Sequence, residues 1–199
     1  MLRYVLLLAC IAGATNTIAQ KPAAAHTKTT EKQVVEIDYK EKGAPMPPIK
    51  VLLYQDSAKN EAIEKGDAEA KRKKSQEKIY LTTEDVANNA NLFVMMFNPT
   101  CSHCEDEAAI MRNNISLFKK TNIVLMANPG MKQYLPDFVH RQHLDDYPTF
   151  RIGIDSADFI NKVYLFQMLP QINIYDHSRK LIKTFNGEVV IDSLKKYIE

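Results

Sequence analysis

The sequence predicts an α/β fold in which a central mixed sheet is flanked by helices. The apolar run LFVMMF at residues 92–97 is typical of a strand buried on both faces. The run NIVLMA at 122–127 indicates a second buried strand, parallel to the first if a helix crosses over between them. Apolar residues between the two runs recur at steps of four and three, as on one face of an amphipathic helix: Cys104, Ala108, Met111, Ile115 and Phe118.

The remaining elements follow from patterning and turn residues. A strand is expected at 49–54, after a proline cluster that excludes helix. A helix start is expected at Thr82 or Thr83. Residues 131–144 have helical spacing that is interrupted at Pro136.

The C-terminal part alternates strands and helices. A strand at 149–154 precedes a short helix that we expect to begin at a cap formed by Asp155 or Ser156. Two further strands flank a polar turn at 176–179, the second ends at Gly187, and an amphipathic helix closes the chain.

Composition sets the size of the core and says little about partners. The chain has 199 residues, of which 45% are hydrophobic, enough for one domain with extensions. The net charge of +2 offers no electrostatic argument for nucleic acid or a membrane surface as a partner. The function has to be argued from particular side chains.

The N-terminus, MLRYVLLLACIAGATNTIAQ, has the form of a secretory signal peptide at 1–19, with cleavage after Ala19. Its apolar run is too short to span a membrane, and no later run approaches that length. We therefore expect an exported protein, in the bacterial periplasm. LLAC, ending at Cys10, could instead be a lipoprotein cleavage box; it is the less favoured alternative because little hydrophobic sequence precedes it.

Two segments have the composition of exposed chain. Residues 20–42 predict a flexible tether behind the cleavage site. Residues 55–78 are rich in Ala, Glu and Lys with few large apolar side chains, which indicates a charged, exposed insertion. A basic docking patch at 71–74 (KRKK) is the alternative for part of it.

The pair Cys101 and Cys104 forms the CSHC motif, with Ser102 and His103 between the cysteines. After loss of the signal peptide these would be the remaining cysteines. A disulfide between them closes almost no loop, so structural stabilisation is a poor explanation. At the start of a helix, unpaired backbone amides and the helix dipole favour a thiolate on the outer residue, Cys101.

This placement predicts thiol–disulfide exchange. Cys101 would attack a substrate disulfide, and Cys104, one helical turn further on, would resolve the mixed disulfide. A positively charged His103 would further stabilise the thiolate. The acidic residues that follow the motif act in the opposite direction: Glu105, Asp106 and Glu107.

A structural metal site is the main alternative use of the two cysteines. The motif provides two zinc ligands, and His140 and His143 have the spacing to complete a Cys2His2 set. The histidines lie far from the cysteines in sequence, and a histidine pair on a polar helix is usually surface. We therefore favour the redox interpretation and expect no metal.

The order strand, CxxC, helix, strand, proline, hairpin and final helix resembles the thioredoxin fold. Within that superfamily, GAPMPPIKVL (43–52) and MFNPTCSHCEDE (96–107) are similar to motifs of the exported TlpA/ResA-like thiol–disulfide oxidoreductases, including their CxxCxxE pattern at Glu107. The resemblance covers 43–199 and implies a thioredoxin-like domain with an N-terminal extension and a central insertion at about 128–168. It implies protein thiols and disulfides as substrates, a membrane or soluble redox partner, and no cofactor.

The resemblance also implies a cis-proline facing the cysteines, for which Pro148 and Pro170 are candidates. Pro170 is followed by strand, turn, strand, glycine and final helix, as in the family, whereas Pro148 is followed by an additional strand and helix. We therefore expect a cis Leu169–Pro170 bond, with the Leu169 backbone beside Cys101.

Three features depart from the family. The sequence has no tryptophan, the dipeptide within the motif contains no proline, and Met95 stands where thioredoxins often have a buried acid. The direction of electron flow therefore stays open. Two other functions remain as alternatives: a thioredoxin-like binding or metal-delivery module, and a peroxidase, for which Thr100 before Cys101 is a partial match.

Overall fold

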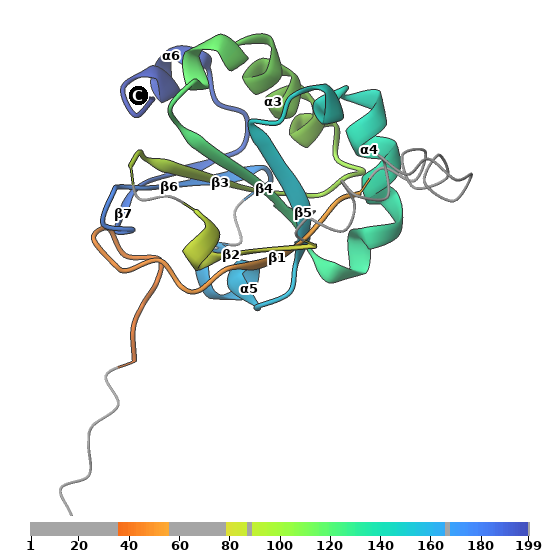
Figure 1. The fold of residues 1–199 in the computed structure, drawn as a ribbon. Helices are drawn as coiled ribbons and strands as arrows, with labels where there is room; N and C mark the ends of the chain where they lie inside the picture. The colour runs from red at the N-terminus through yellow and green to blue at the C-terminus, as the bar shows by residue number, and fades with distance from the viewer. Residues whose placement is uncertain (1–35, 56–78, 87–88, 166–167, 199) are drawn as a thin grey trace, which may run out of the picture. The chain divides into compact units, whose positions relative to one another are not determined.

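The computed structural model describes residues 36–55, 79–86, 89–165 and 168–198 (Figure 1). The chain divides into two compact units, of which Glu36–Glu199 contains every described residue. The predicted signal peptide, the alternative lipidation site at Cys10 and residues 56–78 of the predicted insertion lie outside the described residues.

The described residues form one seven-stranded sheet with the order β2-β1-β5-β4-β3-β6-β7. Pairs β3–β4 and β4–β5 are parallel and the other pairs are antiparallel, so the predicted mixed sheet is confirmed. The strands are β1 Lys50–Leu53, β2 Tyr80–Thr82, β3 Leu92–Phe97, β4 Asn122–Ala127, β5 Phe150–Asp155, β6 Gln171–Tyr175 and β7 Leu181–Asn186.

Strand β3 is the central strand of the site, between parallel β4 and antiparallel β6. All six of its residues are buried, as the continuous apolar run predicts. Successive side chains point to opposite faces, so Phe93, Met95 and Phe97 enter one core and the alternate residues enter the other.

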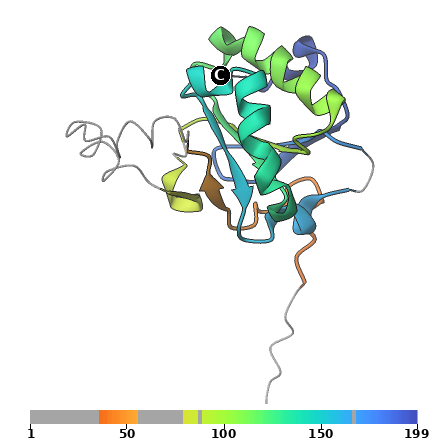
Figure 2. The same ribbon diagram turned by 90° about the vertical axis from the view of Figure 1, so that its right-hand side faces the viewer.

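The helices divide between the two faces of the sheet (Figures 1 and 2). One core contains side chains of α3 Ser102–Asn113, α4 Leu135–Arg141 and α6 Ile191–Lys195. The other contains α5 Phe159–Val163 and residues from the N-terminal strands. Four 3-10 turns complete the elements: η1 Thr83–Asp85, η2 Ile115–Phe118, η3 Pro129–Tyr134 and η4 Leu144–Asp146.

Several predicted helices are shorter than their apolar patterns. The stripe that runs to Phe118 is divided, because α3 ends at Asn113 and η2 continues after Asn114, whose side chain donates to the carbonyl of Ile110 at 2.8 Å. Pro136 does not interrupt a helix but lies in the first turn of α4, where a missing N–H costs nothing.

The expected helix start at Thr82 or Thr83 is a single 3-10 turn preceded by the unpredicted strand β2.

The first turn of helix α5 receives a side-chain hydrogen bond from a residue that precedes the helix by several positions. We expect its cap at Asp155 or Ser156, but α5 begins at Phe159 with Asp158 in the left-handed region at φ 59°. The carboxylate of Asp155 nevertheless accepts the amide of Ile160 at 2.9 Å, within the first turn. The N-cap residue is Asp158, so the predicted cap and helix start were both wrong, although Asp155 still supplies a hydrogen bond to the first turn.

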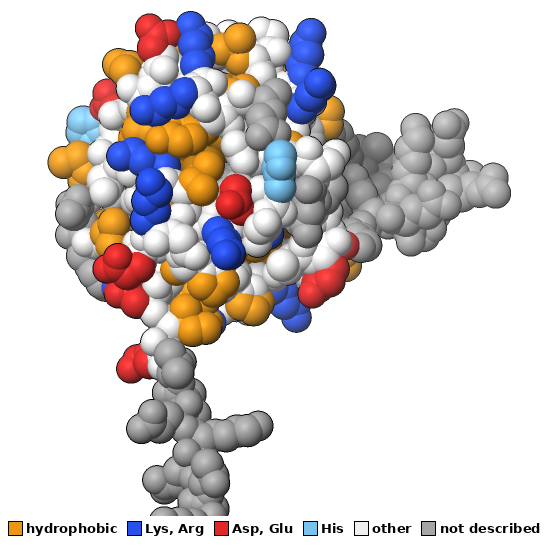
Figure 3. Space-filling model, turned by 90° about the vertical axis from the view of Figure 1, so that its left-hand side faces the viewer, with side chains coloured by type: hydrophobic (Ala, Val, Ile, Leu, Met, Phe, Trp, Pro, Cys, Tyr) orange, Lys and Arg blue, Asp and Glu red, His pale blue; other side chains and the backbone are white. Residues whose placement is uncertain are grey.

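Strand β7 forms one edge of the sheet, and Figure 3 shows the face on that side. Lys and Arg side chains are scattered there among apolar and acidic ones. Lys183 of β7 is exposed and its Nζ lies 5.0 Å from the ring centroid of Phe185. Lysine on an edge strand hinders pairing with another chain. In the described part of the chain, no helix has the length and apolar character needed to cross a bilayer.

Candidate functional site

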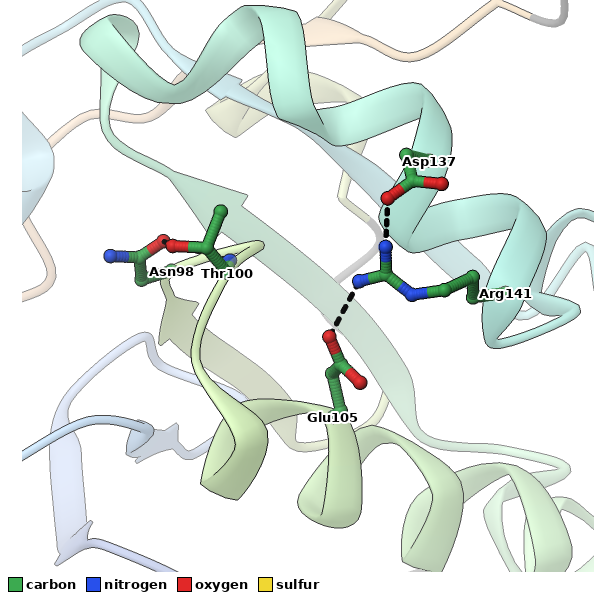
Figure 4. Close-up of polar contacts among 5 residues, drawn as sticks. All are labelled: Asn98, Thr100, Glu105, Asp137 and Arg141. Carbon is green, nitrogen blue, oxygen red and sulfur yellow. Dashed lines mark hydrogen bonds and ion pairs between the residues drawn. The ribbon is translucent and has the colours of Figure 1, made fainter.

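The CSHC motif begins directly after a side-chain-stabilised turn at the end of β3. Oδ1 of Asn98 accepts both the amide and the hydroxyl of Thr100, each at 2.9 Å (Figure 4). The amide of Cys101 then donates to the carbonyl of Asn98 at 3.1 Å. This turn places Cys101, with extended backbone, at the N-cap of α3. The predicted position of the pair at a helix start is confirmed.

The two thiols have different environments. Cys101 is partly exposed, whereas Cys104 is fully buried one turn into α3. Both are free thiols in this structure. Burial raises the pKa of Cys104 far above its ordinary value; the amide of Asn98, 3.5 Å from its Sγ, opposes this, and Cys101 and Glu105 add to it. Cys101 is thus the accessible thiol of the pair.

The loop before β6 lies across from the start of this turn. Its Leu169–Pro170 bond is cis, as predicted, and among the described residues it is the one cis bond. Met96 pairs with Gln171 in the antiparallel register of β3 and β6. Continuing that register places Pro170 opposite Phe97 and Leu169 opposite Asn98. Pro148, the rejected candidate, has a trans bond.

The side chain of Gln171 fixes this loop to the end of α5. Its Nε2 donates to the carbonyl of Val163 at 3.0 Å, and its Oε1 accepts the amide of Leu165 at 2.9 Å. Gln171 is fully buried, so these hydrogen bonds satisfy groups that would otherwise be costly. The side chain of Gln171 therefore anchors the start of β6, directly after the proline loop, to the C-terminal end of α5.

A mainly apolar pocket of about 280 Å³ opens beside the proline loop. Asn98 and Leu169 both line it, which supports the proximity inferred from the register. Its apolar lining comes from the end of β3, from η3, from α5 with its C-cap residue, and from the proline loop: Met96, Phe97, Met131, Ile160, Tyr164 and Leu169. The backbone amide and carbonyl of Leu169 have no hydrogen-bond partner among the described residues.

Glu105, the acidic residue directly after Cys104, forms an ion pair with Arg141 of α4. Arg141 contacts Oε1 of Glu105 at 2.5 Å and also pairs with Asp137 on its own helix (Figure 4). Arg141 therefore lies between the carboxylates of Glu105 and Asp137, and its positive charge offsets part of their negative charge.

Comparison with known proteins identifies the fold. No family model matches the sequence, and no curated protein matches it. The thioredoxin domain of a thiol-disulfide oxidoreductase from Bacteroides vulgatus superposes with a TM-score of 0.56 and 14% identity, over 80% of this chain and 99% of that one. A Chlorobium tepidum protein assigned as the thiol:disulfide interchange protein DsbE gives 0.56 and 13%, over 79% and 94%. The chain has a thioredoxin-like fold.

A Bacteroides thetaiotaomicron protein assigned as a protein disulfide isomerase superposes equally well, with a TM-score of 0.56 and 14% identity over 81% of this chain and 91% of that one. At these identities the similarity concerns the fold, and the predicted fold class is confirmed. Within this thioredoxin-like fold, the motif lies at the start of α3 and the cis-proline precedes β6.

Glu107 provides a buried acid, which the sequence analysis did not recognise. Met95 is buried and apolar, as expected, but Glu107 is also fully buried. Its Oε2 accepts the amide of Val189 at 2.7 Å, and its Oε1 has no partner in the described part of the chain. Burial raises the pKa of Glu107 to about 7; the Val189 hydrogen bond opposes this and the charge of Glu188 adds to it. The signal was present, because Glu107 follows Cys104 by three residues on the buried stripe.

His103 lies on the exposed side of the motif and is paired with Glu188 through Nδ1. Their side chains are 67% and 44% exposed. Asp106, three residues after His103 on α3, has a carboxylate oxygen within 4.8 Å of their polar atoms.

The Cys2His2 metal site that the sequence allowed as an alternative is not formed by the described residues. Among the described residues, neither cysteine forms a group of closely spaced ligand atoms with His140 and His143.

Proposed function

We propose that this protein is a thiol–disulfide oxidoreductase that exchanges disulfides with exported polypeptides through Cys101 and Cys104. The observation that carries the proposal is the pairing of an accessible cysteine at a helix N-cap with a buried cysteine one turn further on. The backbone amide and carbonyl of Leu169, opposite Asn98 in the continued β3–β6 register and without a partner among the described residues, add a place for the substrate chain.

In the first step, the thiolate of Cys101 attacks one sulfur of a substrate disulfide. The substrate S–S bond breaks, a mixed disulfide with Cys101 forms, and one substrate thiolate leaves. Cys101 is the N-cap residue of α3, so its side chain stands next to the first-turn backbone amides that have no partner within the helix. The free backbone groups of Leu169 can pair with an extended substrate, as an additional strand does at a sheet edge.

In the second step, Cys104 loses its proton and attacks the Sγ of Cys101. The Cys101–Cys104 bond forms, the mixed disulfide breaks and the second substrate thiolate leaves, so the dithiol has supplied two electrons. Because burial holds Cys104 protonated, this step requires a base. Glu107, on the same buried face of α3, has a suitable pKa for that proton. The Asn98 amide stabilises the charge that develops on Cys104.

Run in reverse, the same steps oxidise a substrate dithiol. In either direction a membrane or soluble redox partner must restore the starting state of the pair. We place the reaction outside the cytoplasm, in the periplasm, on the basis of the predicted signal peptide at 1–19. Secretion of the full chain with cleavage after Ala19 would support this location, and retention in the cytoplasm would contradict it.

The test is a trapping experiment. Cys104→Ala removes the resolving thiol, so we expect covalent complexes with exported proteins that migrate slowly on non-reducing gels and dissociate with dithiothreitol. The matched control is the double variant Cys101→Ala with Cys104→Ala, which should trap nothing. Absence of complexes, together with failure of the wild type to reduce or form protein disulfides, would reject the proposed function.

A further inference from the structure

Three consecutive residues between β7 and α6 each contact a different part of the redox site. The amide of Gly187 donates to the carbonyl of Pro170 at 2.8 Å. The carboxylate of Glu188 pairs with His103 inside the CSHC motif. The amide of Val189 donates to Glu107 at 2.7 Å. The segment 187–189 therefore connects the proline loop, the motif and the buried acid.

The backbone on both sides of Glu188 is fixed. Gly187 has a φ of 76°, which favours glycine, and a Cβ there would lie 2.5 Å from Sδ of Met168. Val189 is buried against the core that contains α3. Since both neighbours are anchored, the position of the Glu188 carboxylate beside α3 is set by the fold and does not depend on ordering a long exposed loop.

The contact with Glu188 also determines how the imidazole is used. A carboxylate can only accept, so the Nδ1 of His103 must carry the proton that is shared with Glu188. This orients the ring through Nδ1 and leaves Nε2 outside the contact with Glu188. Carboxylates that orient a histidine in this way control what its second nitrogen can do.

We propose that Glu188 is a positioning residue that acts through His103 to stabilise the dithiol form of the motif, making the Cys101–Cys104 pair a stronger oxidant. This inference rests on the proposed function. A thiolate exists only in the reduced form, so an imidazole inside the motif, two residues after Cys101, can favour that form over the disulfide. In this proposal Glu188 strengthens the effect of His103 against that of the acidic residues Glu105 and Asp106.

The ion pair between His103 and Glu188 can be removed by substitution without a large loss of folding stability. Both side chains are substantially exposed, and exposed ion pairs contribute at most about 1 kcal/mol to folding. A change in redox equilibrium on substitution would therefore reflect the motif and not unfolding. Asp192→Asn is the matched control, because Asp192 lies in the following helix and pairs only with Lys195 among the ion pairs of the described residues.

The experiment is a double-mutant cycle on the equilibrium between the full-length protein and glutathione. Glu188→Gln should lower the oxidising strength of the pair about fivefold, which is on the order of 20 mV for a two-electron couple. In the His103→Gln background the same substitution removes an uncompensated carboxylate, so it should have no effect or the opposite one. Asp192→Asn should leave the equilibrium unchanged.

The contrary results are equally specific. If Glu188→Gln leaves the equilibrium unchanged, or shifts it equally with and without His103, then Glu188 does not act through the imidazole and the inference is wrong. If the wild type does not equilibrate with glutathione at all, the proposed function fails. In that case the rate of iodoacetamide reaction at Cys101, compared across the same four variants, still decides whether Glu188 acts on the thiol through His103.

Discussion

The backbone amide of Val189 donates a hydrogen bond to Oε2 of Glu107 at 2.7 Å, and both residues are buried. This bond favours the carboxylate, but desolvation outweighs it and raises the pKa of Glu107 to about 7. A group inside the core thus changes its charge near neutral pH, which has consequences for stability that can be measured apart from any redox activity.

Glu107→Gln should change how stability depends on pH. Between its ordinary pKa near 4.5 and its folded value near 7, Glu107 keeps its proton in the folded state and loses it in the unfolded state. The unfolded state therefore binds fewer protons, and wild-type stability falls as pH rises through this window, by on the order of 3 kcal/mol. Gln resembles the protonated acid, so the variant should gain relative stability at high pH.

Urea unfolding of both proteins at about pH 4 and about pH 8 checks this prediction. The advantage of Glu107→Gln should be small at the lower pH and largest at the higher one. Asp145→Asn, which removes an exposed carboxylate in η4, serves as the comparison. A stability difference for Glu107→Gln that stays constant across the two pH values would contradict the pKa.

Apolar patterning was sufficient to predict the fold. Strands β3 and β4 coincide with the continuous apolar runs, because a strand buried on both faces has to be apolar at every position. Strand β2 was missed since it is three residues long and one of its residues, Tyr80, is exposed. Helix lengths were overestimated at α3, where the side chain of Asn114 ends the helix but the apolar spacing continues.

The candidate site was only partly predictable. Cys101 and Cys104 followed from the motif, and the cis Leu169–Pro170 bond followed from the family resemblance, with element order selecting Pro170 over Pro148. The partners that set the charges of the site did not, because they come from distant sequence: Glu188 lies 85 residues from His103, and Arg141 lies 36 from Glu105. Nothing in a local pattern specifies such contacts.

The two cysteines should differ strongly in reactivity. Cys101 is partly exposed at a helix N-cap, whereas Cys104 is fully buried with a raised pKa. In the reduced native protein, iodoacetamide should modify Cys101 at least about tenfold faster than Cys104. Peptide mapping by mass spectrometry distinguishes the two sites. In guanidinium the rates should converge, and similar rates in the native protein would refute the assignment of Cys101 as the attacking thiol.

Arg141→Gln should destabilise the dithiol form of Cys101 and Cys104 relative to their disulfide, with little effect on folding stability. The substitution leaves Glu105 uncompensated beside Cys104, so we expect a shift of a few-fold toward a weaker oxidant in equilibrium with glutathione. The cost in stability should stay below about 1 kcal/mol because the pair is partly exposed. Combining Arg141→Gln with Glu105→Gln removes the unpaired charge and should return the equilibrium toward the wild type. A double variant no different from Arg141→Gln would show that Glu105 is not the mediator.

Gly153→Ala should destabilise the sheet far more than Gly130→Ala. Gly153 of β5 pairs with Leu53 of β1, and a Cβ there would lie 2.2 Å from the carbonyl oxygen of Leu52 and 2.6 Å from Cγ1 of Val51. Because the first of these atoms belongs to the backbone, β1 has to move away from β5, at a cost of about 1–3 kcal/mol or more. At Gly130 the nearest atom is 3.6 Å away, so alanine fits. Urea unfolding measures both variants, and equal effects would mean that β1 and β5 are not in the described register.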